Sequence, residues 1–326
     1  MKTFTKVCLI LAGTLAGVGV IFCIIGGAMG ASFGKMGNVS RTDWGIGWLD
    51  IASDWFSWDE DDFEEFEDYL SEDLPVTSIE NSDGAATYAY GADEIKNISN
   101  LDIDIKAGSL KILESEDEQI RLIVDANGGS VKQGINGSTL TVKDTTKGLF
   151  GGWGLFGWRN KGVKVVLYLP ADMTFEQIEI DVSAGEVNTI GSELTAKDAD
   201  LSVDAGSLKV GVLNVSRKLE ANTGAGEVKI GDLTAEEAEL DCGVGEMDIQ
   251  GTISGNIKAD CGVGELNITL YGEEESFNYV LDCGLGDVRI GSSSYTSLGK
   301  KKKIDNNAEK TMNLDCGVGS IKVKYR

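Results

Sequence analysis

Apolar and polar residues alternate along short stretches in the second half of the chain. In the stretch that begins at Leu240, apolar side chains occupy every second position through Cys242 to Val244. The alternation then slips, because the next apolar residue, Met247, lies an odd number of positions after Val244. Alternation with a period of two is typical of β-strands that bury one face. The pattern predicts that Leu240, Cys242 and Val244 point inward and that the chain turns a corner at 245–246.

This stretch repeats along the chain. The pentapeptide Asp-Cys-Gly-Val-Gly, or a close variant of it, begins at Asp241, Asp260, Asp282 and Asp315. From Gly185 onward the closing glycines follow one another at intervals of 21, 20, 19, 19, 22 and 33 residues. A period near 20 with a strand pattern in each copy is the signature of a stacked solenoid. We therefore predict an all-β fold in which 176–326 form a parallel β-solenoid, or β-helix, with rungs of about 20 residues.

The two ends of the predicted solenoid differ. Seven rungs, each adding about 4.8 Å, would extend over roughly 34 Å. The strand 321–326 carries lysine or arginine at its outward positions, and charged side chains discourage edge-to-edge pairing, so we place it at the open end. Upstream, residues 76–175 contain strand patterns without a tight repeat, and Pro170 ends one of them because proline cannot continue a ladder. We predict that 76–175 is a β cap that includes the first rung.

The first part of the chain has the pattern of a membrane anchor. Residues 7–31 contain no charged side chain, whereas Lys2 and Lys6 precede them and acidic residues follow. A helix of this length extends over about 37 Å, enough to cross a hydrocarbon core of about 30 Å. The positive-inside rule makes 1–6 a cytoplasmic tail and places the rest of the chain outside the cell. We expect a single-pass transmembrane helix that acts as an uncleaved signal anchor; a cleaved signal peptide is the alternative.

The segment 32–75 between the anchor and the first predicted strand is rich in tryptophan and acidic residues. From Arg41 to Asp73 there are 13 acidic residues and one arginine, which accounts for half of the net charge of −24. Its aromatic residues recur at helical spacing. The segment is either a charged spacer whose like charges repel, or an acidic helix with an aromatic face that docks on a basic partner.

Charge and composition exclude several classes of function. The net charge of −24 argues against nucleic acid as a partner, because a surface that binds nucleic acid needs clustered positive charge. The chain contains no histidine, which removes the commonest general base, the histidine-dependent nucleophile systems and histidine zinc sites. We expect no enzymatic activity, no cofactor and no metal site.

The cysteines of the repeats occupy equivalent positions. We expect Cys242, Cys261, Cys283 and Cys316 to form a structural ladder in the core, where a free cysteine behaves as a small hydrophobe. Disulfides between neighbouring rungs are the alternative, although their geometry would be strained, and a metal site would need converging ligands. The repeated carboxylates form similar columns. Either solvent and nearby lysines offset their repulsion, or calcium ions bridge them.

One loop differs in character from the rest of the chain. Residues 147–161 are rich in glycine and aromatic side chains and carry local positive charge. The loop either folds back to plug the end of the solenoid, or is an exposed docking loop for lipid headgroups, for a partner or for the chain's own acidic helix. The candidate docking residues are Phe150, Trp153, Phe156, Trp158 and Arg159.

Four sequence features together resemble one bacterial cell-envelope family. They are the N-terminal run MKTFTKVCLILAG, the Trp-rich acidic segment, a strand that ends VVLYLP, and rungs of the form DCGVGELNI. This family of unknown function is widespread in Gram-positive bacteria and is usually labelled "putative adhesin". The resemblance covers essentially the whole chain and implies a membrane anchor followed by a β-solenoid. It offers no catalytic residues, and the association of its members with membrane-stress regulators implies an accessory signalling role.

Taken with the residues themselves, this resemblance leads us to expect a non-enzymatic binding or scaffold protein of the bacterial cell envelope. Its partners would be the membrane together with an extracellular polymer or another membrane protein. An accessory sensor or regulator in envelope-stress signalling is the alternative. A polysaccharide-active β-helix enzyme is a more distant one.

Overall fold

The computed structural model describes residues 79–326 apart from 81–84, 116, 127–128, 147–161 and 297–300. The predicted cytoplasmic tail, the anchor and the juxtamembrane segment therefore lie outside the described residues, as does the aromatic loop. In the part of the chain that is described, no helix is long and apolar enough to cross a lipid bilayer. Most of the described residues lie in β-strands and very few in helices, which agrees with the predicted all-β class.

The described elements are β-strands of 2 to 17 residues, one short α-helix and one 3-10 helix. In chain order they are β1 (Ile79–Glu80), β2 (Ala85–Tyr90), α4 (Ala92–Ile95), β3 (Asn100–Ile105), β4 (Gly108–Ser115), β5 (Ile120–Asp125), β6 (Val131–Asn136), β7 (Thr139–Asp144), β8 (Val163–Pro170), β9 (Thr174–Val182), β10 (Glu186–Asn188), β11 (Glu193–Val203), β12 (Ser207–Thr223), β13 (Glu227–Cys242), β14 (Glu246–Ile253), β15 (Ile257–Cys261), β16 (Glu265–Leu270), η3 (Glu274–Ser276), β17 (Phe277–Cys283), β18 (Asp287–Ile290), β19 (Ser293–Thr296), β20 (Lys302–Ile304), β21 (Lys310–Cys316) and β22 (Ser320–Tyr325).

A rung consists of two strand segments joined by a glycine corner, and the junction of β13 with β14 shows how one forms. Leu240 and Cys242 are buried before the corner, and Met247 and Ile249 are buried after it. Successive residues of a strand point to opposite faces, so the side chains between them point outward. The inward side chains of all rungs merge into one continuous apolar core. The predicted alternation on either side of the corner is therefore confirmed.

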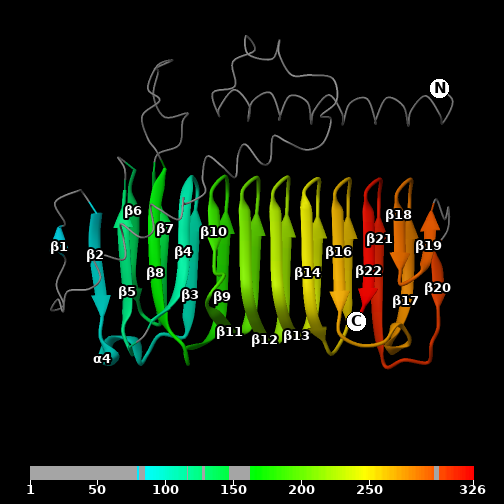
Figure 1. The fold of residues 1–326 in the computed structure, drawn as a ribbon, viewed down its shortest axis with the longest axis horizontal. Coiled ribbons are helices and arrows are strands. Elements are labelled where there is room, and N and C mark those ends of the chain that lie inside the picture. The colour runs from blue at the N-terminus through cyan, green and yellow to red at the C-terminus, as the bar shows by residue number, and fades with distance from the viewer. Residues whose placement is uncertain (1–78, 81–84, 116, 127–128, 147–161, 297–300) are drawn as a thin grey trace, which may run out of the picture. The chain divides into compact units, whose positions relative to one another are not determined.

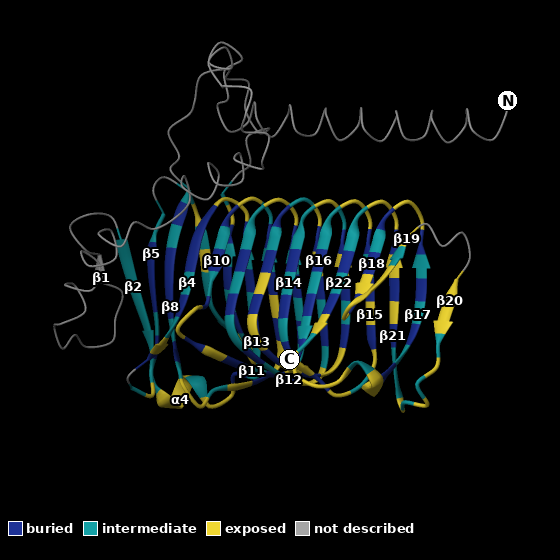
Figure 2. Cartoon of the chain, turned by 45° about the vertical axis from the view of Figure 1, so that its right-hand side comes forward, coloured by how far each residue is buried: buried dark blue, intermediate teal, exposed yellow. Residues whose placement is uncertain are grey.

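The prediction that Val244 points inward is wrong. The chain bends over residues 243–245 rather than at 245–246, so Val244 lies at the outer tip of the corner. Its side chain is 40% exposed. The equivalent residues of three other rungs are exposed as well: Val263, Leu285 and Val318. Figure 2 shows the corners as a row of exposed and intermediate tips along one edge of the sheet. An alternation pattern cannot separate the last inward residue of a strand from an apolar tip of the bend that follows.

The last glycine of each corner is required by the close approach of neighbouring rungs. A Cβ on Gly245 would lie 2.0 Å from the carbonyl oxygen of Gly226, and one on Gly264 would lie 2.2 Å from that of Gly245. The Gly226 oxygen also accepts a hydrogen bond from the N–H of Glu246 at 3.0 Å, which holds the two backbones together. Gly245 is not among the residues with positive φ, so space rather than backbone angle selects glycine here.

Neighbouring rungs pair in parallel, but their order in space differs from their order in the sequence. The nine rungs formed by the described residues are, in spatial order, β7/β8, β3/β4, β9/β10, β11/β12, β12/β13, β13/β14, β15/β16, β21/β22 and β17/β18. Figure 1 shows the red strands of β21/β22 between the yellow β16 and the orange β17 and β18. The prediction that 321–326 form the open end is therefore wrong, because β22 pairs with a strand on each side. Every rung carries a similar pattern, so the repeat pattern alone does not reveal which rung is the neighbour of which.

Antiparallel strands close both ends of the stack. At one end β19 pairs with β18, and β20 pairs with β17. At the other end β5 pairs with β8 and β6 pairs with β7, and β2 and β1 extend that edge. The part of the chain predicted as the solenoid forms seven rungs, the number predicted, whereas the predicted cap region contains two rungs rather than one, so that the stack has nine described rungs. Rung β3/β4 lies inside the stack, between β7/β8 and β9/β10.

Candidate functional site

The structure places the four predicted ladder cysteines in one column, in the spatial order Cys242, Cys261, Cys316, Cys283. All four are buried, and none of them forms a disulfide. The Sγ atoms of Cys242, Cys261 and Cys283 donate to the carbonyl oxygens three residues later at 3.3, 3.2 and 3.1 Å. The hydrogen bond with the Cys242 sulfur, together with burial, raises the pKa of Cys261 to about 11. Its protonated, buried thiol is part of the packing rather than a nucleophile.

Carboxylates form columns on the two outer faces that meet at the corners. The Asp column precedes the corner and consists of Asp241, Asp260, Asp315 and Asp282. The Glu column follows the corner and consists of Glu227, Glu246, Glu265 and Asp287, with Ser320 between the last two. Nearby cations offset part of the repulsion: Lys258 Nζ lies 2.9 Å from Asp260, and Lys322 Nζ lies 2.5 Å from Glu265. Within the described residues, no three His, Cys, Asp or Glu side chains are arranged to hold a metal ion.

Carboxylates are also crowded on the outer face of β3, β9 and β11. Burial and repulsion from Glu179 raise the pKa of Asp181, and burial likewise raises the pKa of Asp200. One carboxylate oxygen of Asp102 and one of Asp200 are buried without a hydrogen-bond partner. Lys143 Nζ, at 2.7 Å from the other oxygen of Asp102, offsets part of the negative charge. This face is therefore anionic, and its repulsion is incompletely relieved.

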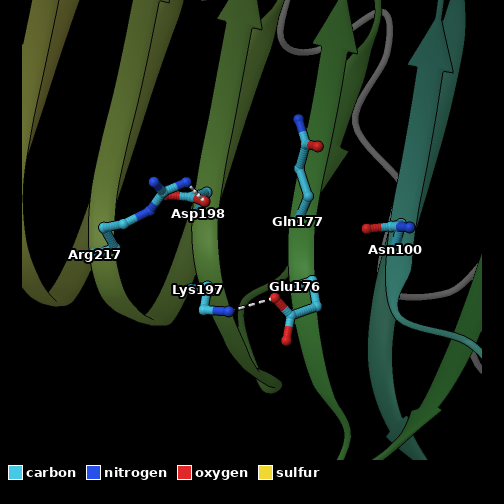
Figure 3. Close-up of a pocket in the computed structure, with 6 residues that line it drawn as sticks. All are labelled: Asn100, Glu176, Gln177, Lys197, Asp198 and Arg217. Atoms are coloured by element: carbon cyan, nitrogen blue, oxygen red, sulfur yellow. Dashed lines mark hydrogen bonds and ion pairs between the residues drawn. The ribbon is translucent and has the colours of Figure 1, made fainter.

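A polar groove lies beside this anionic face. It has a volume of about 320 Å³ and is lined by Asn100, Glu176, Gln177, Lys197, Asp198 and Arg217, shown in Figure 3. Arg217 Nε donates to Asp198 Oδ1 at 2.7 Å, and Lys197 Nζ lies 2.6 Å from Glu176 Oε2. The Arg217 guanidinium holds the pKa of Asp198 below its usual range.

Irregularities in the strand pairing create the polar groove. The register of β11 against β12 shifts between Ala196 and Asp198, and that of β12 against β13 shifts between Val215 and Lys218. Lys197 and Arg217 lie within these irregular stretches. Such bulges bend the strand and re-aim side chains, which here brings cations beside carboxylates. Sequence reasoning missed the groove, although Lys197 and Asp198 are adjacent polar residues that break the alternation between buried positions.

The groove side chains suit binding more than bond cleavage. Its guanidinium, ammonium, amide and carboxylate groups are donors and acceptors whose remaining hydrogen-bonding capacity can serve hydroxyl or amide groups of a ligand. Both carboxylates that line the groove, Glu176 and Asp198, are paired with cations. Glycoside hydrolysis needs one carboxyl with a raised pKa as the general acid, whereas the pKa of Asp198 is lowered. No lining residue of the groove is a hydroxyl or thiol nucleophile.

The predicted docking residues Phe150, Trp153, Phe156, Trp158 and Arg159 lie outside the described residues. The described residues on both sides nevertheless fix where this loop begins and ends. Asp144, at the end of β7, accepts from the N–H groups of Ala107 at 3.0 Å and Thr146 at 2.8 Å. Val163, at the start of β8, donates to the carbonyl oxygen of Ala107 at 3.2 Å. The loop therefore starts and ends beside the corner of rung β3/β4.

Several solved structures are similar to this chain at low sequence identity. A "putative adhesin" from Bacteroides fragilis is 16% identical, with a TM-score of 0.41 and coverage of 75% of this chain and 99% of that one. A "putative cell adhesion protein" from Clostridium sporogenes is 15% identical, with a TM-score of 0.32 and coverage of 74% and 99%. A "putative lipid binding protein" from Parabacteroides distasonis is 14% identical, with a TM-score of 0.37 and coverage of 75% and 98%. No curated protein matches the chain significantly.

One protein-family model matches the chain over most of the described rungs. The family is described as Toastrack DUF4097, and the match runs from residue 98 to residue 293. This range is more than half of the 326 residues. It begins just before β3 and ends at the start of β19, so it contains every rung except β21/β22. The chain therefore belongs to the Toastrack DUF4097 family.

Proposed function

We propose that this protein is a non-enzymatic binding and scaffold protein of the bacterial cell envelope. In this proposal residues 7–31 hold it in the cell membrane as a single-pass anchor, with the N-terminus in the cytoplasm and the β-solenoid outside. The observation that supports a binding role is the periodic outer surface, on which equivalent side chains recur in straight columns over successive rungs. A periodic surface suits a ligand with repeating groups, whereas catalysis needs one set of converging groups.

The polar groove suggests the chemical class of the ligand. Its side chains alternate in charge and include two amides, Asn100 and Gln177. Alternating charge favours a ligand that offers both donors and acceptors over a strongly charged one. We therefore propose a polar extracellular polymer with repeating hydroxyl or amide groups, such as a cell-wall polysaccharide.

A sedimentation assay tests this proposal. Full-length protein in a mild nonionic detergent is mixed with insoluble cell-wall polysaccharide from a Gram-positive bacterium, and the bound fraction is measured. Replacing both Lys197 and Arg217 by alanine removes the two cations of the groove, and we expect binding to weaken about tenfold, which corresponds to about 1.4 kcal/mol. Lys96→Ala, which removes an exposed, ion-paired lysine just after α4, is the matched control. Equal binding by the double variant, or no sedimentation of the wild type, would contradict the proposal.

A further inference from the structure

A line of apolar side chains runs along the corner edge, one from each of eight consecutive rungs. We call this line the corner ridge; in spatial order it consists of Ala107, Ala184, Ala205, Ala225, Val244, Val263, Val318 and Leu285. Backbone hydrogen bonds hold neighbouring corners together: the N–H of Val263 donates to Gly243 at 2.7 Å, and that of Val318 donates to Gly262 at 2.8 Å. The row of corners is visible along the upper edge in Figure 2.

The fold does not require these corner residues to be apolar. Leu285 is 66% exposed and Val263 is 59% exposed, so their side chains contribute little to the core. Short polar residues are ordinarily favoured in exposed turns. Exposed apolar residues that occur singly need no explanation, but a contiguous row of them marks an interaction surface. The ridge therefore has the character of a docking line, with its bulkiest members between Val244 and Leu285.

Carboxylates flank this bulky half of the corner ridge on both sides, from the Asp column and the Glu column. Four of them pair with cations: Asp260, Asp282, Glu265 and Asp287. Asp241, Glu246 and Asp315 form no ion pair with the described lysines and arginines. Burial and repulsion from Asp282 and Asp260 raise the pKa of Asp315, which shows that added positive charge would be favourable there.

We propose that the corner ridge from Val244 to Leu285 docks a cationic amphipathic helix. The apolar stripe of the helix would lie along the ridge, and its lysines or arginines on either side would reach Asp241, Glu246 and Asp315. The spacing fits, because three rung intervals of about 4.8 Å extend over roughly 14 Å, and three helical turns of about 5.4 Å extend over roughly 16 Å. An anionic bilayer would instead be repelled by the two acidic columns. The surface is distinct from the polar groove, so this inference does not depend on polysaccharide binding.

A designed peptide probes the ridge directly. The probe is an 18-residue fluorescent peptide of leucine and lysine with its leucines at helical spacing, and the control peptide has the same composition in scrambled order. Fluorescence anisotropy is measured with the full-length protein in a nonionic detergent, against detergent alone. We expect the patterned peptide to bind at least tenfold more tightly than the scrambled one, with affinity that falls as salt is added. Equal binding of the two peptides would overturn the proposal.

Matched variants locate the contact. Val244→Ser, Val263→Ser and Val318→Ser combined should weaken peptide binding at least tenfold, while Ile190→Ser, which removes an apolar side chain that is 60% exposed outside the ridge, should not. Far-UV circular dichroism of the triple variant is the control for folding, and we expect the wild-type spectrum. Unchanged binding by that variant would overturn the proposal.

The charge contribution and the lipid alternative need separate measurements. Asp241→Asn with Asp315→Asn should weaken binding and flatten its salt dependence, while the exposed Asp172→Asn should change neither. Unchanged affinity in the double variant would remove the charge argument. Ridge-dependent binding of phosphatidylglycerol vesicles without binding of the peptide would overturn the proposal in favour of a lipid surface. None of these outcomes depends on the polysaccharide assay, so the two proposals can fail separately.

Discussion

Replacing Gly245 by alanine tests whether the close approach of rungs determines the corner sequence. The new Cβ would lie 2.0 Å from the carbonyl oxygen of Gly226, whereas ordinary contact begins at 3.4 Å. The shortfall of 3.4 − 2.0 = 1.4 Å must be relieved by separation of the two backbones. A movement of this size breaks the hydrogen bond of 3.0 Å from the N–H of Glu246 to the Gly226 oxygen, and loosens the core beside Met247.

The expected cost follows from these two effects. Overpacking of a tight site costs about 1–3 kcal/mol, and the lost hydrogen bond adds about 1 kcal/mol. We therefore expect Gly245→Ala to lower the free energy of unfolding by about 2–4 kcal/mol. Gly243→Ala in the same corner is the matched control, because its Cβ would lie 2.8 Å from the Gly224 oxygen and the shortfall is only 3.4 − 2.8 = 0.6 Å. Both variants lose the same unfolded-state freedom of a glycine, so their difference reports the steric effect.

Urea unfolding followed by far-UV circular dichroism measures this difference. Far-UV circular dichroism is chosen because it reports directly on the strands that form the rungs. With a slope of about 1–3 kcal/mol/M, a loss of about 3 kcal/mol shifts the midpoint by roughly 1–3 M. If Gly245→Ala shifted the midpoint no further than Gly243→Ala, the assignment of the corner glycine to steric approach would be refuted.

Other expected outcomes concern charge and the buried thiols. Asp181→Asn should raise the free energy of unfolding at pH 7 by about 0.2–1 kcal/mol, because it removes a like charge from neighbouring strands. The folded-state pKa of Asp181 is raised above 3.8, so the gain should shrink as the pH falls through that raised pKa and should be absent below 3.8, where the carboxyl is protonated in both states; a destabilised variant at pH 7 would contradict this. Glu239→Gln should cost less than about 1 kcal/mol at pH 7, because Glu239 pairs with Lys218 and Lys258 at an exposed site. These lysines lower the pKa of Glu239 to about 2, so in melts across a pH series the advantage of the wild type should be complete above pH 4.5 and vanish toward pH 2. Finally, an aromatic disulfide reagent should leave Cys261 unmodified in the native protein and modify it in urea, as read by peptide mass; rapid native labelling would show that the column opens.

The sequence was sufficient to predict the class of fold and most of the interior of a rung. Leu240, Cys242 and Met247 are buried as predicted, because the alternation of apolar and polar residues directly reflects which face of a strand meets the core. The repeat near 20 residues likewise predicted the stack, because each repeat buries its apolar face only against its neighbours. Val244 could not be placed in this way, since an apolar residue at an exposed tip has the same local pattern as the last inward residue of a strand.

The features that pattern reasoning missed depend on contacts between distant residues. Rung β21/β22 stacks between two rungs that precede it in the chain, and similar patterns give no signal for that order. The polar groove depends on bulges that bring Arg217 beside Asp198, and the position of a bulge is set by pairing with the neighbouring strand. The anchor and the aromatic loop stay predictions, because they lie outside the described residues.

Because β21/β22 lies between β15/β16 and β17/β18, residues 310–325 must be in place before this end of the stack can be completed. During synthesis β17/β18 emerges before the rung on which it stacks, so it has no parallel neighbour until the later strands arrive. Removing residues 310–325 would leave a gap inside the stack rather than a shorter stack. At the other end, β3/β4 is synthesised before β7/β8 and β9/β10, so it is covered on both sides only after these later strands have formed. An open repeat array can unravel rung by rung from its ends. Here the rung next to each end is not adjacent in sequence order to both of the rungs on which it stacks. Loss of a terminal rung is therefore coupled to disruption of the interior.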